Sequence, residues 1–221
     1  MNPIAFQRDE TGAVLVEISI LLPIVITILC GSIDFLYAFY QWNAAAKAVQ
    51  VGARIAAVSD PVAAGLNDLS NQVVLNGSVA SRRPMPEFTI ICDGSVEACT
   101  CSGNCPGISA NPYNAAAMNR ILFGRGSSSC TDATSYYTTG MCDILPAITA
   151  ANVRIVYTQT GLGYAGRPGG PVPTITVSLQ NLQFQFFFLS YLLGASVPIP
   201  AMTTTITAED LCSAAIGSCG S

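Results

Sequence analysis

Residues 12–34 read GAVLVEISILLPIVITILCGSID, an apolar run with one acidic residue near each end. Between Glu17 and Asp34 stand sixteen uncharged residues, 18–33, which as an α-helix span about 24 Å. The helix predicted over residues 13–40 is about 42 Å long, enough to cross a hydrocarbon core of about 30 Å. Because a charged side chain at the bilayer centre costs about 2.5–3.5 kcal/mol or more, one of the two acids must lie near the hydrocarbon edge, or the bilayer thins locally.

The far end of this predicted helix has the composition of a membrane interface. Five aromatic residues gather there, as in interfacial aromatic belts: Phe35, Tyr37, Phe39, Tyr40 and Trp42. Pro23 lies in the middle of the span, where it removes one backbone hydrogen bond and favours a kink. Alanine-rich residues 43–59 continue the helix, and their small side chains let another helix or a sheet approach closely. Asp60-Pro61 is predicted to end it.

A cleavable secretory signal is the alternative interpretation of this segment. Such a signal has an apolar region of about 7–15 residues, a basic start and an Ala-x-Ala exit. The apolar run here is longer, and its start at Arg8-Asp9-Glu10 is net acidic, although Ala44-Ala45-Ala46 offers an exit. The pattern therefore favours a retained membrane helix.

Three motifs of the N-terminal region together resemble the TadE family. They are GAVLVEISILLP at 12–23, GSIDFLY at 31–37 and AVQVGARIAA at 48–57. Members of that family are pseudopilins of the tight-adherence (Flp, type IVb) pilus system. The resemblance covers residues 10–58, about a quarter of the chain, with a weaker echo at 200–211.

The resemblance implies proteolytic processing and a role in assembly. In prepilins a membrane peptidase cuts directly after the glycine, here between Gly12 and Ala13, and Glu17 becomes residue five of the mature chain. Glu17 would then meet the new α-amine of a neighbouring subunit, on an assembly helix that also carries Pro23 and Asp34. The expected partners are membrane lipid, the prepilin peptidase, the Flp major pilin, sister pseudopilins and an inner-membrane assembly platform.

Cysteine positions indicate an oxidising compartment. Cys30 lies in the apolar helix as a small filler, and eight further cysteines follow that helix: Cys92, Cys99, Cys101, Cys105, Cys130, Cys142, Cys212 and Cys219. An even set suggests up to four disulfides, with 105 possible pairings among which the sequence does not choose. The alternative is a metal site, but the chain has no Cys-x-x-Cys pair and no histidine.

The cysteines and the basic residues disagree about orientation. One basic residue, Arg8, precedes the apolar helix, and two, Lys47 and Arg54, follow it. By the positive-inside rule, this distribution favours a cytoplasmic C-terminus. Eight thiols in a reducing cytosol would need another explanation, so we expect a cytoplasmic N-terminus. The C-terminal domain is then periplasmic, in the bacterial inner membrane.

Composition argues against nucleic-acid binding and against the common catalytic constellations. The net charge is −4 and the basic residues are scattered, so no electrostatic footprint for nucleic acid is present. Without histidine, Ser-His-Asp and Cys-His catalysis are excluded. Gly161-Leu-Gly163-Tyr-Ala-Gly166 matches a dinucleotide motif, but the following Arg167-Pro-Gly-Gly-Pro171 cannot open a helix, which favours a hairpin turn. We therefore expect no cofactor and no enzymatic activity.

The remaining sequence predicts an α+β domain. Helices are expected at 62–79 and 114–123, and β-type runs at 87–92, 152–159, 174–188 and 201–207, with loops at 93–112 and 124–142. The apolar run 186–193 is too short to span a membrane as a helix and is expected in the core. The predicted architecture is a long membrane-spanning helix and a pilin-like domain with a three- or four-stranded antiparallel sheet and disulfide-stapled loops.

The sequence thus predicts three parts: a cytoplasmic leader at 1–12, a transmembrane and extended helix at 13–60, and a periplasmic disulfide-rich domain at 61–221. The function expected from the resemblance is that of a minor pseudopilin in Flp pilus assembly. The alternative is a membrane-anchored surface adhesin or binding module that uses its cysteine-rich ectodomain as a contact surface.

Overall fold

A computed structural model of the chain describes residues 11–130, 139–190, 194, 197–208 and 211, with the side chains of 11–13 left out. The described residues form two compact units. The first contains the described residues of the ranges 1–40 and 184–197, and the second contains the described residues of 41–183 and 198–221. The predicted division at residues 12 and 60 stays a prediction.

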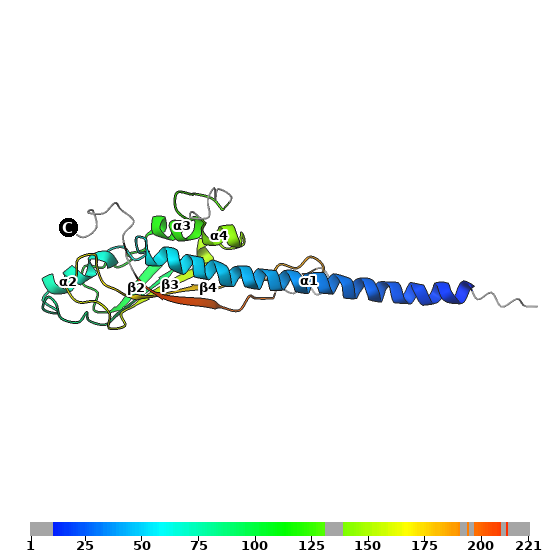
Figure 1. Cartoon of the computed structure of the whole chain (residues 1–221), viewed down its shortest axis with the longest axis horizontal. Helices are drawn as coiled ribbons and strands as arrows, with labels where there is room; N and C mark the ends of the chain where they lie inside the picture. The colour runs from blue at the N-terminus through cyan, green and yellow to red at the C-terminus, as the bar shows by residue number, and fades with distance from the viewer. Residues whose placement is uncertain (1–10, 131–138, 191–193, 195–196, 209–210, 212–221) are drawn as a thin grey trace, which may run out of the picture. The chain divides into compact units, whose positions relative to one another are not determined.

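One long helix, α1, opens the fold. It runs without interruption over Thr11–Ala57, with Pro23 inside it, and is drawn from blue to cyan in Figure 1. Its end three residues before Asp60-Pro61 agrees with the expected stop, because proline has no N–H and disfavours helical backbone at the residue before it.

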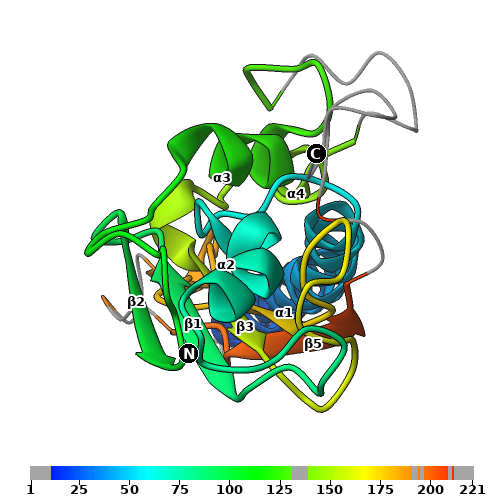
Figure 2. The same ribbon diagram turned by 90° about the vertical axis from the view of Figure 1, so that its left-hand side faces the viewer.

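Within the described residues the sheet has five antiparallel strands, which confirms the α+β class and corrects the predicted number of three or four strands. Its strands are β1 (Phe88–Asp93), β2 (Ala98–Gly103), β3 (Val153–Thr158), β4 (Thr174–Leu179) and β5 (Met202–Thr207). They lie in the order β2-β1-β3-β4-β5, and each neighbouring pair is antiparallel. Figure 2 shows β1, β2, β3 and β5 from one end.

Two boundaries of the sheet differ from the sequence prediction. Strand β2 lies inside the segment 93–112 that was predicted to be loop, because it pairs with β1 through a short turn and is joined to it by a disulfide. Strand β4 ends at Leu179 rather than continuing to residue 188. Asn181 adopts a φ of +55° there, a left-handed conformation that breaks extended backbone and that asparagine tolerates.

Alternating side chains give the sheet one buried face and one polar face. The buried residues of the three central strands are Phe88, Ile90, Cys92, Val153, Ile155, Tyr157, Ile175, Val177 and Leu179. The residues between them are mostly threonine and serine, as expected for an antiparallel sheet with one solvated face.

The C-terminal part of α1 packs in the second unit through small side chains. Ala53, Ala56 and Ala57 are each 1% exposed, at the three- and four-residue spacing of one helix face. Figures 1 and 2 show this part of α1 running along the sheet. A Cβ added at Gly52 would collide with the buried Met141 side chain, so glycine at this position lets Met141 pack directly against the helix backbone. This confirms that residues 43–59 let other elements approach closely.

Short helices complete the second unit. A 3₁₀ turn (Leu66–Asp68) and α2 (Leu69–Leu75) replace the longer helix predicted at 62–79, since Gly65 takes a left-handed φ of +86°. Helix α3 (Ala115–Phe123) confirms the helix predicted at 114–123. Its N-cap, Asn114, accepts hydrogen bonds from the N–H groups of the next turn.

The predicted loop at 124–142 contains the start of helix α4 (Met141–Ile144). A further 3₁₀ turn, Ala150–Asn152, leads into β3. The hairpin turn predicted at 161–171 is confirmed, because this segment joins the antiparallel neighbours β3 and β4.

Tyr157 ties the chain segment that follows α1 to the middle of the sheet. Its phenol oxygen accepts a hydrogen bond from the Val62 N–H at 3.0 Å, and both residues are fully buried. Burial raises the pKa of Tyr157 well above its usual range, because the ionised phenolate would be removed from water.

We predict that Tyr157→Phe lowers the free energy of unfolding by about 1–3 kcal/mol, because it leaves the buried Val62 N–H without an acceptor. Denaturant unfolding of the full chain in detergent measures this, with the half-exposed Tyr164→Phe as control. The raised pKa adds a pH signature: the stability from neutral Tyr157 is complete below about pH 10 and is lost as pH rises further, since only the unfolded phenol ionises there. Equal stability of the two variants would contradict the role of this bond.

Candidate assembly helix and its two carboxylates

The N-terminal part of α1 is apolar all around and unburied. The side chains of Val14, Leu15, Val16, Ile18, Ile20, Leu21, Leu22, Ile24, Val25, Ile26, Ile28 and Leu29 are each at least half exposed. Within the described residues, α1 is the one helix long and apolar enough to cross a membrane. A helix that is apolar on every side needs lipid or other helices around it, which is consistent with a membrane-anchored protein.

Pro23 lies inside this apolar part without ending the helix. The Thr27 hydroxyl donates a hydrogen bond to the Pro23 carbonyl at 2.8 Å, and Ser19 donates to the Val16 carbonyl at the same distance. Side-chain hydroxyls that reach backbone carbonyls in this way help membrane helices to tolerate proline.

Glu17 projects from the first turns of α1 into the surroundings of the helix. Its side chain is exposed, and in the part of the chain that the structure describes no hydrogen bond or ion pair holds its carboxylate. Gly12 and Ala13 lie in the first turn of α1. Ala13 stands four residues before Glu17, a spacing that places two residues on the same helix face.

Asp34 is in the opposite situation. It is fully buried, and its carboxylate accepts three hydrogen bonds from consecutive backbone N–H groups. Oδ1 accepts from Phe187 at 2.8 Å, and Oδ2 accepts from Phe188 at 2.9 Å and from Leu189 at 2.6 Å. Residues separated by more than 150 positions in the sequence therefore meet at one carboxylate.

The segment that supplies these donors, Phe184–Ser190, is named here the aromatic segment. The Phe187 ring packs on Tyr37 of α1 with centroids 4.7 Å apart. The Phe184 N–H donates to the Val197 carbonyl at 2.8 Å. The sequence predicts residues 186–193 in the core, but Phe187 and Phe188 are 56% and 47% exposed, so the prediction is wrong for both. Residues 191–193 lie outside the described residues. An acid inside an apolar helix needs donors, and this was the available signal that another segment would approach Asp34.

The structure pairs six of the predicted disulfide cysteines. Cys92 pairs with Cys99 across β1 and β2, Cys101 pairs with Cys105, and Cys130 pairs with Cys142 at the start of α4. Cys212 and Cys219 lie outside the described residues. Cys30 is a free thiol on α1, as expected. Because these six cysteines form disulfides, they have no thiolates with which to bind a metal, which argues against the alternative of a metal site for them.

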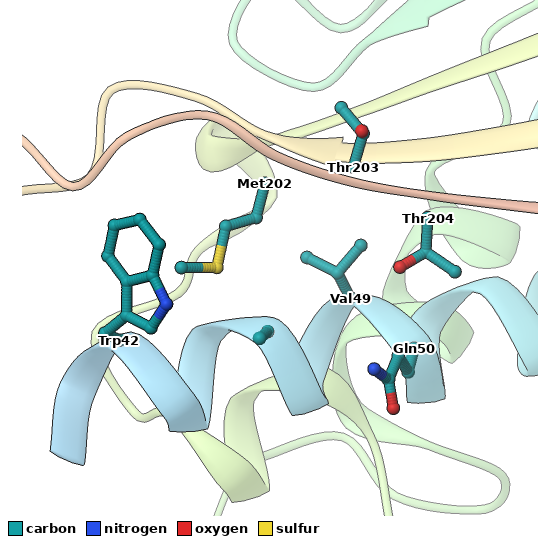
Figure 3. A pocket seen from close by; sticks show the side chains of 7 residues that line it. Trp42, Val49, Gln50, Met202, Thr203 and Thr204 are labelled. Carbon is teal, nitrogen blue, oxygen red and sulfur yellow. The ribbon is translucent and has the colours of Figure 1, made fainter. Parts of the chain in front are cut away.

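A small pocket of about 220 Å³ lies between α1 and the edge strand β5 in the second unit. Figure 3 shows Trp42, Val49 and Gln50 of α1 on one side and Met202, Thr203 and Thr204 of β5 on the other. Its lining carries indole, thioether, amide and hydroxyl groups and no ionisable side chain. None of the processing or assembly residues predicted from the sequence lines it.

Comparison with protein families matches residues 12–54 to the TadE-like protein family. This range contains Gly12, Ala13, both carboxylates and most of α1. No curated protein and no solved structure matches the chain. The family match supports involvement in tight-adherence pilus systems and association with pilus components.

We predict that Asp34→Ala accelerates amide exchange at residues 187–189 by about tenfold or more, because three N–H groups lose an acceptor worth roughly 1–2 kcal/mol. Hydrogen–deuterium exchange of the full chain in detergent measures this. Asp34→Asn, which keeps one carbonyl oxygen, should give an intermediate effect, and Glu17→Ala should give none. Unchanged exchange in Asp34→Ala would show that these hydrogen bonds do not order the segment.

Proposed function

We propose that the chain is a non-enzymatic minor pseudopilin of the tight-adherence pilus apparatus. It would be anchored in the bacterial inner membrane by α1, with a cytoplasmic N-terminus and a periplasmic disulfide-bonded domain. The family match at residues 12–54 supports the pilus system, and the three disulfides support an oxidising compartment for the domain.

One observation carries the proposal: of the two acids that flank the apolar run, Asp34 has its donors within the chain, while Glu17 is exposed. A carboxylate beside hydrocarbon is costly without a partner. Glu17 is therefore the acid available to a group from another molecule. The partner that fits is a cation at a matching depth in the membrane.

Processing would create such a cation. Cleavage between Gly12 and Ala13 by a prepilin peptidase would free the α-amine of Ala13 at the start of α1. The ammonium of one subunit would meet Glu17 of its neighbour. Moving two paired opposite charges from water to a low-dielectric environment costs less free energy than moving either charge alone. The pair would set the axial register between neighbouring helices, whose apolar faces pack around it.

The proposal predicts that protein extracted from membranes begins at Ala13. Mass spectrometry of the intact N-terminus tests this directly, and cells without prepilin peptidase activity are the control, in which the residues before Ala13 should be retained. A start at Met1 in peptidase-competent cells would overturn the processing step. A start near Ala46 would instead identify a cleaved secretory signal.

Glu17→Ala should reduce pilus assembly while leaving the protein in the membrane. Breaking a buried ion pair costs about 3–5 kcal/mol, so we expect the yield of sheared surface pili to fall by roughly tenfold or more. The exposed acid Glu87 in the second unit offers a matched control, Glu87→Ala, with unchanged yield expected. Immunoblots of membrane fractions establish equal protein levels, and normal pilus yield from Glu17→Ala at such levels would refute the pairing role.

A further inference from the structure

We propose that the aromatic segment Phe184–Ser190 is a second membrane contact, seated at the boundary between lipid head groups and acyl chains and held there by Asp34. The inference concerns lipid binding and does not depend on the pilus role. It requires only that the apolar part of α1 lies in a bilayer.

The depth of the segment follows from its bonds to Asp34. Glu17 and Asp34 are seventeen residues apart in one continuous helix, a rise of about 26 Å. A hydrocarbon core is about 30 Å thick. With Glu17 at one edge, Asp34 lies just inside the other edge, and the three N–H bonds fix residues 187–189 at the same depth.

The hydrogen bonds solve two problems of that environment together. A carboxylate near hydrocarbon needs donors, and irregular backbone near hydrocarbon needs acceptors for its N–H groups. Asp34 and the backbone of residues 187–189 satisfy each other, and the carboxylate is thereby fully buried. In water neither group would need the other, because solvent would supply both partners.

The surface of the segment is suited to lipid. Phe187 and Phe188 are about half exposed, and Phe35 and Phe39, which follow Asp34 on α1, are 70% and 62% exposed. Aromatic side chains are typical of the membrane interface. No charged residue occurs between Pro168 and Ala208, so the segment and its flanks carry no charge that would have to be dehydrated.

The exposed rings are not simply unpacked core. The Phe187 ring packs on Tyr37 and still leaves 56% of the residue uncovered within its compact unit. This unit consists of the apolar half of α1 and the loop that contains the aromatic segment. The uncovered rings are therefore continuous with a surface for which lipid is the natural solvent, and lipid is the occupant we assign to them.

Depth-dependent fluorescence quenching tests the assignment. Trp42 is the chain's only tryptophan, so Trp42→Phe gives a background into which Phe187→Trp or Phe188→Trp introduces a single reporter. The full chain is reconstituted at low protein-to-lipid ratio into phosphatidylcholine vesicles whose acyl chains carry bromine either near the head group or near the chain end. We expect strong quenching by the shallow bromines and severalfold weaker quenching by the deep ones.

Two matched reporters calibrate the measurement. Leu29→Trp, on the apolar part of α1, should be quenched by deeper bromines, and Leu75→Trp, an exposed position in the second unit, should respond to neither lipid. A response at positions 187 and 188 equal to that of Leu75→Trp would overturn the proposal. Quenching at positions 187 and 188 that is lost as the protein-to-lipid ratio rises would identify a second copy of the chain as the occupant. That result would also overturn the proposal.

The same vesicles test whether Asp34 holds the aromatic segment at the interface. Asp34→Ala combined with the Phe187→Trp reporter should reduce shallow quenching severalfold, while Asp34→Asn should retain much of it. If Asp34→Ala leaves the quenching unchanged, Asp34 does not hold the segment at this depth. Because no pilus component is present in the vesicles, failure here is distinct from failure of the proposed pilus function.

Discussion

A carboxylate beside hydrocarbon must find hydrogen-bond donors, and this requirement organises the first compact unit. The Asp34 carboxylate gathers the N–H groups of three consecutive residues, 187–189, more than 150 positions away in the sequence. The same bonds satisfy backbone groups that a loop near lipid could not leave open. Without this exchange, the apolar helix would carry an uncompensated charge, and residues 187–189 would lose the acceptor of three N–H groups.

The two acids that flank the apolar run divide the tasks of the helix. Asp34 is buried and satisfied inside its own chain, whereas Glu17 faces outward from a surface that is apolar on all sides. In our proposal, the inward-facing acid positions a membrane-facing loop, and the outward-facing acid awaits the amine of another subunit. Two residues with the same chemistry thus take different roles because only one has donors within reach.

Helix α1 also serves two environments along its length, and its composition changes accordingly. Its first half carries large aliphatic side chains that remain exposed, and its second half carries alanine and glycine that are buried in the second unit. Small side chains permit the close approach that the polypeptide around them requires, as the contact of Gly52 with Met141 illustrates. Disulfides fasten β2 to β1 and hold the cysteine-rich turns where the chain has few apolar residues to bury.

Local sequence patterns are sufficient to predict the long apolar helix, its stop before Asp60-Pro61, the α+β class and the strand character of β3, β4 and β5, because these follow from local periodicity and from residues that break helices. The pairing of the cysteines, the presence of β2 and the partner of Asp34 depend instead on contacts between parts of the chain that are distant in sequence. Strand β2 has weak strand character of its own and forms because β1 offers an edge and a disulfide joins them. The Asp34 bonds connect α1 with a segment far along the chain, and local patterns carry no information about which distant backbone will supply the donors a buried charge needs.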